Sequence, residues 1–170
     1  MASRLWRAFW RWYESHYLLN VAIAAGLFLL QAVHLVWLLG DVILPRIGAG
    51  EIFGASGALM AILVLVDYTE IPALISVSLL SINELRKRFV LREVFYLFAL
   101  NIQWLHLFWI TDEFVIHTFA GHTFFPIWLA WVAILIDYLE LPVMVATVKK
   151  LIMALRESPR EAVVVFLERG

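Results

Sequence analysis

Hydrophobic residues are distributed along the chain in four long runs, separated by shorter polar stretches. The runs cover approximately residues 20–43, 55–80, 94–114 and 126–148. A membrane-spanning helix needs about 20 consecutive and mostly apolar residues, and each run is long enough to supply one. The pattern therefore predicts an all-α integral membrane protein in which four transmembrane helices form a bundle.

Positive charges are distributed unevenly around these runs. Of the 13 Lys and Arg residues, all except Arg46 lie before the first run, between the second and the third, or after the fourth. Segments rich in Lys and Arg stay on the cytoplasmic side of a membrane. We therefore predict a cytoplasmic-type membrane, with the N- and C-termini both cytoplasmic. The charged fraction of 16% also favours a membrane protein, since an ordinary soluble domain has roughly 25% charged residues.

The two ends of the chain differ from the apolar runs. Residues 1–19 alternate aromatic side chains with Arg, which is typical of an amphipathic helix lying in the headgroup layer. Residues 151–170 contain "SPRE", a capping-box pattern that starts helices. We expect a second amphipathic segment there, on the cytoplasmic side.

The two halves of the chain carry the same motifs. The segment "QAVHLVWLLGD" (31–41) is matched by "QWLHLFWITDE" (103–113), and "VDYTEIP" (66–72) is matched by "IDYLELP" (136–142). Each half would cross the membrane twice, so both would have the same orientation. The sequence predicts two tandem helical hairpins, residues 20–82 and 83–150, related by a pseudo-twofold axis along the membrane normal.

The residues that the halves share are mostly polar, which hydrophobicity alone would not require. The matched pairs are Gln31/Gln103, His34/His106, Trp37/Trp109, Asp41/Glu113, Asp67/Asp137, Tyr68/Tyr138, Glu70/Glu140 and Pro72/Pro142. Spacings of three and four residues keep the polar groups of each run on one helix face. At 1.5 Å per residue, the histidines and the four acids from Asp67 to Glu140 reach one layer, in the middle to outer half of the bilayer.

The acids are expected to face the interior of the bundle, because a carboxylate facing lipid costs about 2.5–3.5 kcal/mol. Each acidic pair is followed by a proline, which cannot donate a hydrogen bond to the carbonyl four residues earlier. We expect Pro72 and Pro142 to kink their helices and to leave the carbonyls of Tyr68 and Tyr138 beside the acids.

Two histidines and four carboxylates are also the ligand count of di-iron and di-manganese four-helix proteins, although the order of the ligands along the helices differs. The candidate ligands are His34, His106, Asp67, Glu70, Asp137 and Glu140. We expect two divalent transition-metal ions, Fe or Mn, and Zn also suits imidazole and carboxylate. The chain has no cysteine, which excludes thiolate ligands. Asp41 and Glu113 are either further ligands or charges at the outer mouth.

Other shared residues have predicted roles around this centre. Gln31 and Gln103 would orient the imidazoles. Trp37 and Trp109 would form walls of the cofactor site. Tyr68 and Tyr138 would relay protons or electrons during catalysis.

Several functions fit this set of residues. The first is an oxidoreductase with a dinuclear metal site, acting on an apolar or lipid-borne substrate. The second is a divalent cation or proton transporter or channel, for which four spans would require a homodimer. Haem held by His34 and His106 ranks lowest, because haem would not need four nearby acids. A purely structural polar network is the remaining alternative. The expected partners are membrane lipid and a second copy of the chain, and nothing indicates nucleic acid.

Overall fold

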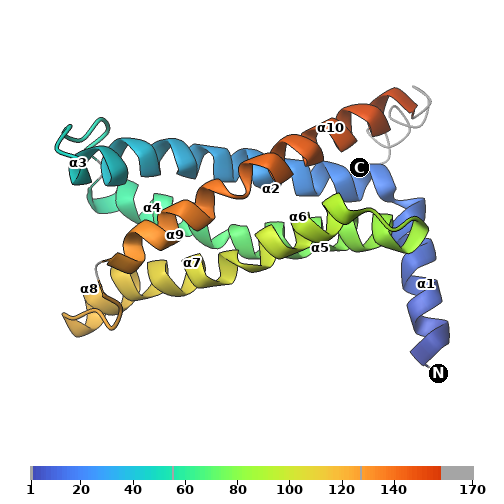
Figure 1. Cartoon of the computed structure of the whole chain (residues 1–170), viewed down its shortest axis with the longest axis horizontal. Coiled ribbons are helices and arrows are strands. Elements are labelled where there is room, and N and C mark those ends of the chain that lie inside the picture. Colours follow the sequence, from blue (N-terminus) through green and yellow to red (C-terminus); the bar gives the residue numbers. More distant parts are fainter. Residues whose placement is uncertain (1, 55, 127, 158–170) are drawn as a thin grey trace.

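The computed structural model describes residues 2–54, 56–126 and 128–157, and within these ranges it contains helices and short connections but no strand (Figure 1). Four helical segments are long and apolar enough to cross a membrane: Tyr17–Arg46, Gly57–Lys87, Leu91–Glu113 and Trp128–Glu157. Each overlaps one of the four hydrophobic runs. The all-helical class and the number of such segments are therefore confirmed.

Each segment consists of more than one helix. The first contains α2 (Tyr17–Trp37), the π-helical turn η1 (Leu38–Ile43) and α3 (Leu44–Arg46). The second contains α4 (Gly57–Tyr68) and α5 (Glu70–Lys87). The third contains α6 (Leu91–Asn101) and α7 (Gln103–Ile110), followed by the π-helical turn η2 (Thr111–Ile116) and α8 (His117–Ala120). The fourth contains α9 (Trp128–Tyr138) and α10 (Leu141–Glu157).

The four segments lie side by side around a common interior. Helix α2 packs along α5 and α10, and α5 also packs along α6. In the other half of the bundle, α4 contacts α2 and α7, and α7 packs along α9. The four helices α2, α4, α7 and α9 therefore bring the middle of every segment to the same place.

The expected kinks are present as breaks in two segments. Helix α4 ends at Tyr68, and the amide of Thr69 turns back to donate to the Val66 carbonyl at 2.9 Å. Helix α9 ends at Tyr138, and the amide of Leu139 donates to the Ile136 carbonyl at 2.9 Å. Both breaks come shortly before a proline, whose ring and missing N–H prevent the regular helical bond at that point.

The short helix α1 (Ala2–Ser15) turns away from the long helices (Figure 1). Trp10 and Tyr13 on its inner face are buried, and the Arg86 guanidinium lies 4.2 Å from the centre of the Trp10 ring. Burial raises the pKa of the Tyr13 phenol, and the nearby Tyr17 and Glu84 raise it further. The predicted amphipathic helix thus exists and is docked on the bundle. The capping box at 158–161 lies outside the described residues, and residues 151–157 continue α10.

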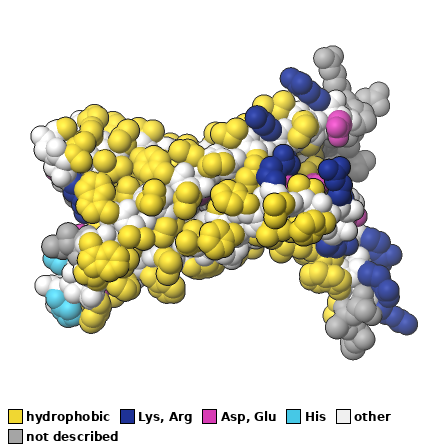
Figure 2. All heavy atoms as spheres, in the orientation of Figure 1, with side chains coloured by type: hydrophobic (Ala, Val, Ile, Leu, Met, Phe, Trp, Pro, Cys, Tyr) yellow, Lys and Arg dark blue, Asp and Glu magenta, His cyan; other side chains and the backbone are white. Residues whose placement is uncertain are grey.

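Hydrophobic side chains cover the middle of the molecular surface, whereas Lys and Arg gather mostly at the end where α1 lies (Figure 2). Leu65 and Leu135 are 66% and 65% exposed, yet Asp67 and Asp137, two residues further along the same helices, are 1% and 2% exposed. Along this part of α4 and α9, the polar face is turned inward and an apolar face outward.

Candidate metal centre

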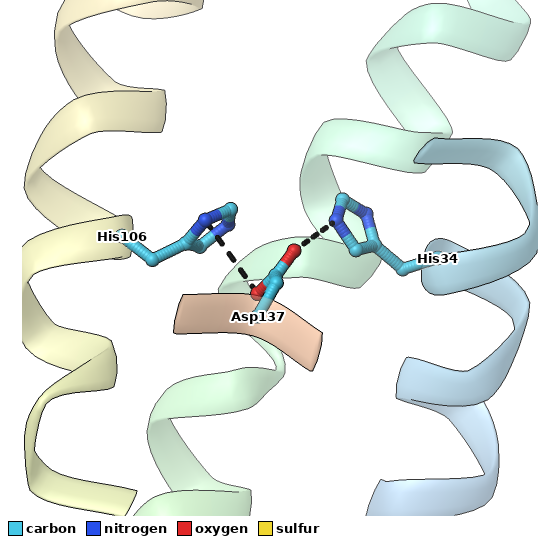
Figure 3. Close-up of side chains that lie close together, drawn as sticks. All are labelled: His34, His106 and Asp137. Carbon is cyan, nitrogen blue, oxygen red and sulfur yellow. Dashed lines mark ion pairs between the residues drawn. The ribbon is translucent and has the colours of Figure 1, made fainter. Parts of the chain in front are cut away.

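Four side chains, one from each segment, form a closed ring at the centre of the bundle. Nε2 of His34 lies 3.3 Å from Oδ1 of Asp67 and 3.4 Å from Oδ2 of Asp137. Nε2 of His106 lies 3.4 Å from the same Asp67 oxygen, and its Nδ1 lies 3.5 Å from Oδ1 of Asp137. Each carboxylate therefore lies between both imidazoles, as Figure 3 shows for Asp137. We call these four residues the His–Asp ring.

The His–Asp ring is enclosed, and most of its polar atoms lack hydrogen bonds. Its four residues are at most 2% exposed. Neither nitrogen of either imidazole has a hydrogen-bond partner among the described residues, nor does either oxygen of Asp67. Two neutral imidazoles carry one N–H each, so they could fill at most two of the four contacts. A buried polar group left unpartnered costs about 1–3 kcal/mol, so a bound ligand would stabilise the ring.

The separations in the ring have the size expected for ligands that share a metal ion. Nitrogen and oxygen ligands lie about 2.0–2.1 Å from a bound Zn²⁺, which places neighbouring ligand atoms of a tetrahedral shell about 3.3–3.4 Å apart. The four ring contacts measure 3.3–3.5 Å. N–H···O hydrogen bonds are shorter, at about 2.7–3.2 Å. The separations are thus compatible with metal ligands, and His106, which contacts Asp67 through Nε2 and Asp137 through Nδ1, would direct its two nitrogens to different ions.

Two further carboxylates, from Glu70 and Glu140, adjoin the ring. Both side chains are 1% exposed, and neither oxygen of Glu70 has a hydrogen-bond partner among the described residues. Glu140 lies close enough to Asp137, His106 and Asp67 for their charges to interact. Two groups of ligand atoms lie within 4.8 Å of one another and could each hold a metal ion: His34, His106 and Asp137, and Asp67, Glu70 and His106. Five of the six predicted ligands thus fall in these two groups, which share His106, whereas Glu140 belongs to neither.

The two glutamines contact backbone rather than imidazole. The side-chain amide of Gln31 donates to the Val66 carbonyl and to the Thr69 hydroxyl, both at 3.0 Å. The amide of Gln103 donates to the Ile136 carbonyl at 2.8 Å. Val66 and Ile136 immediately precede the two ring aspartates. Each glutamine therefore holds an aspartate-bearing helix in place, instead of orienting a histidine as expected from the sequence.

The tryptophans and tyrosines surround the ring in different ways. The rings of Trp37 and Trp109 lie 5.4 and 5.8 Å from the imidazoles of His34 and His106, and their role as walls of a cofactor site stays a prediction. The hydroxyl of Tyr138 donates to the Leu35 carbonyl at 3.1 Å. The hydroxyl of Tyr68 contacts that of Thr111 at 2.7 Å. These contacts tie the tyrosines to the other hairpin, and their relay role stays a prediction.

The outer acids have partners in the loops, and one pairing from the sequence is wrong. Oδ1 of Asp41 accepts a hydrogen bond from the Phe53 amide at 2.8 Å. Asp112, which is 2% exposed, accepts bonds from the amides of Phe124 and Phe125 at 2.9 Å. Asp112 is therefore the structural counterpart of Asp41, and Glu113 is not. Neither Asp41 nor Glu113 belongs to the two ligand groups.

The two acids occupy different positions in the π-helical turns. Asp41 is the fourth residue of η1, and Asp112 is the second residue of η2. A π-helical turn closes its hydrogen bonds over five residues instead of four, so residues beyond it no longer follow the spacing of an α-helix. Sequence spacing matched Asp41 with Glu113, whereas hydrogen bonding matches it with Asp112. The signal that could have identified Asp112 was the aromatic pair Phe124–Phe125 twelve residues later, where Phe53 follows Asp41 by the same interval.

The fold and the site together define an all-helical protein with four potentially membrane-spanning segments and buried His/carboxylate groups that could hold metal ions. Comparison of the chain with protein-family models, with curated proteins and with solved structures finds no match.

Proposed function

We propose that this protein is an integral membrane metalloprotein whose central site holds two divalent transition-metal ions and performs oxidoreductase chemistry on an apolar or lipid-borne substrate. The observation that carries the proposal is the His–Asp ring. It is buried and built from all four segments, and its imidazole nitrogens and the Asp67 oxygens have no hydrogen-bond partner among the described residues.

Membrane insertion is supported by the surface of the four segments. Their outward-facing side chains are apolar, while the carboxylates and imidazoles face inward. The exposed leucines Leu65 and Leu135 would contact lipid, which avoids the unfavourable free energy of exposing apolar side chains to water. In this arrangement the end rich in Lys and Arg lies on the cytoplasmic side.

A repeat of two hairpins is supported by matched contacts. Gln31 and Gln103, 72 residues apart, each bond the carbonyl that precedes a ring aspartate. Tyr138 bonds the Leu35 carbonyl directly, and Tyr68 contacts Thr111, whose hydroxyl donates to the Leu107 carbonyl at 2.7 Å. Leu35 and Leu107 each follow a ring histidine. We propose that a pseudo-twofold axis along the membrane normal relates the two hairpins.

A dinuclear centre is supported by charge and by the position of the aspartates. Two divalent ions would balance the four carboxylates, as in di-iron and di-manganese helical bundles. Segments 47–85 and 93–148 contain no Lys or Arg whose positive charge could balance these carboxylates. Asp67 and Asp137 each lie between both imidazoles and so could bridge the ions, with Glu70 and Glu140 beside them. Imidazole and carboxylate suit Fe and Mn, which supply redox chemistry, and also Zn, which does not.

Enclosure of the ring favours ions that stay bound over ions that pass through. The ring residues are at most 2% exposed, and the Trp37 and Trp109 rings pack against the imidazoles. An apolar groove of about 480 Å³ between α2 and α4 is lined by Ala32, Val33, Val36, Trp37, Phe53, Leu59 and Leu63. This α2–α4 groove would place a hydrophobic substrate against Trp37, next to the His34 imidazole.

The metal content of the purified protein tests the proposal. Protein isolated without chelator or nickel resin is expected to contain Fe or Mn at about two ions per chain by elemental analysis. Asp67→Asn and Asp137→Asn should each abolish this content, because each removes a carboxylate that contacts both imidazoles. Asp112→Asn is the matched control: it changes an equally buried aspartate that bonds loop amides, so the metal should remain.

Two outcomes would contradict the proposal. Absence of metal from wild-type protein, with both ring variants folded and as stable as the wild type, would reduce the ring to a structural network. A single loosely held ion, together with ion uptake into proteoliposomes that the ring variants lose, would assign the site to transport instead.

A further inference from the structure

A cavity of about 610 Å³ opens near the end of the bundle that carries most of the Lys and Arg residues. Its polar lining includes Tyr17, Glu84, Arg92, Glu93, Lys149 and Lys150, and its apolar lining includes Leu141, Val145 and Met153. These residues come from α2, α5, α6 and α10. We call this cavity the α6–α10 crevice, and it has no part in the metal centre described above.

The crevice lies where α6 and α10 pack less closely than the neighbouring helices do. Helix α2 packs along both α5 and α10, and α5 packs along α6, whereas α6 and α10 are joined by the ion pair between Lys150 and Glu93 at 3.1 Å. In Figure 1, α10 rises away from α6 toward the end where α1 lies. The bundle is therefore open along one seam at this end and packed along the others.

The charges in the crevice leave a positive balance. Glu93 is 1% exposed, and its two oxygens are contacted by Lys150 Nζ at 3.1 Å and by Arg92 Nη2 at 3.3 Å. Glu84 accepts a bond from the Tyr17 hydroxyl at 3.5 Å. Three cations thus face two carboxylates. The Arg92 side chain is 63% exposed and its guanidinium lies 5.8 Å from the centre of the Tyr96 ring, so it can contact a ligand at the mouth.

We propose that the α6–α10 crevice is a binding site for an anionic phospholipid. The phosphate would contact Arg92 and Lys149 at the mouth, and an acyl chain would lie along Leu141, Val145 and Met153. Basic pockets between transmembrane helices at the cytoplasmic side bind anionic headgroups. The volume falls within the range of about 300–1,000 Å³ found for small-ligand sites. A metal cation is disfavoured there, because three positive side chains would repel it.

Lipid retention measures this site directly. The full-length protein is reconstituted in a mixture of phosphatidylglycerol and phosphatidylcholine, extracted, and analysed by native mass spectrometry for bound lipid. We expect wild-type protein to retain phosphatidylglycerol selectively. The double variant Arg92→Ala/Lys149→Ala should reduce that selectivity about tenfold or more, since each surface cation contributes appreciably to binding an anionic lipid.

Two further variants distinguish lipid binding in the crevice from general attraction of anionic lipid by surface charge. Arg88→Ala/Arg156→Ala removes the same number of charges from the same end of the molecule, outside the crevice lining, and should retain the lipid. Val145→Trp changes no charge but fills the apolar part of the crevice, so it should release the lipid. Lys150 is left in place because its ammonium, 13% exposed and 3.1 Å from Glu93, is the closer and more buried of the two cations that compensate this carboxylate.

Three results would overturn the assignment. The first is equal retention of both lipids by the wild type. The second is equal loss in the crevice and control double variants. The third is displacement of the lipid by millimolar inorganic phosphate, which would identify a site for free phosphate. Metal content is not expected to change in any of these variants, so the lipid site and the metal centre are tested independently.

Discussion

At the level of single residues, hydrogen bonding separates the buried polar side chains into two kinds. Gln31, Gln103 and Asp112 donate to or accept from backbone groups at 2.8–3.0 Å. The ring histidines and Asp67 have no such partners among the described residues. Side chains of the first kind hold helices and loops in position, and those of the second kind remain available to a ligand.

The positioning role of the glutamines predicts an effect on stability. Gln103→Leu removes the donor to the buried Ile136 carbonyl and should lower the free energy of unfolding by about 1–3 kcal/mol. Gln31→Leu removes two bonds and should cost at least as much. Denaturant unfolding in detergent measures the free energy of unfolding of both variants. Asn101→Ala is the control, since the exposed Asn101 amide bonds only the Leu97 carbonyl of its own helix. Unchanged stability in both glutamine variants would contradict the assigned role.

At the level of helices, the breaks in the second and fourth segments place the acids. Asp67 belongs to α4 and Glu70 starts α5, with Thr69 turning between them. Asp137 likewise belongs to α9, and Glu140 lies in the turn before α10. A continuous helix would keep each pair one turn apart on one face. The break frees the glutamate from that constraint.

Removal of a break should therefore affect metal binding more than stability. Pro142→Ala restores an N–H that can bond the Tyr138 carbonyl and lets α9 continue into α10, so stability should be kept or increased. Glu140 would then be fixed one helical turn from Asp137 instead of lying in the turn before α10, and metal affinity should fall about tenfold, as when other supporting groups of metal sites are lost. Competition with a chelator measures this. Pro45→Ala, at the start of α3, should leave affinity unchanged, and an unchanged affinity in Pro142→Ala would contradict the role of the break.

At the level of the whole molecule, the distribution of side chains supports the proposed insertion in a membrane. The outer faces of α4 and α9 are apolar, and their polar residues gather at the centre. The Lys and Arg residues gather mostly at one end, beside α1 (Figure 2). In a membrane, the apolar faces would contact lipid and the polar residues would be kept away from it.

The proposed topology can be tested with single cysteines, because the natural chain has none. Ser15→Cys and Phe89→Cys lie at the Lys/Arg-rich end and change no charge. Ala49→Cys lies in the loop between the first two segments. In inside-out membrane vesicles, a membrane-impermeant thiol reagent should label the first two and not the third, because the first two positions would be cytoplasmic. Labelling of all three from one side would contradict four spans.

The sequence predicted the long helices and the ligand set because both depend on local patterns. Hydropathy over about 20 residues defines a span wherever the chain later packs. Pro72 and Pro142 break their helices through their own covalent structure. Motifs shared by the two halves singled out the two histidines and four acids, and helical rise placed them at similar depth before any contact was known.

Tertiary structure decided how these residues meet. Which carboxylate lies between which imidazoles depends on the packing of α2, α4, α7 and α9, and no spacing along one helix determines it. The glutamines bond the carbonyls beside Asp67 and Asp137 because the partner helix brings those carbonyls within hydrogen-bond reach. Asp112 makes the loop contacts expected for Glu113 because it lies at a different position in its π-helical turn than Asp41 does. The α6–α10 crevice arises where one helix pair packs less closely than its neighbours do, and the sequence contains no local signal of a gap between helices.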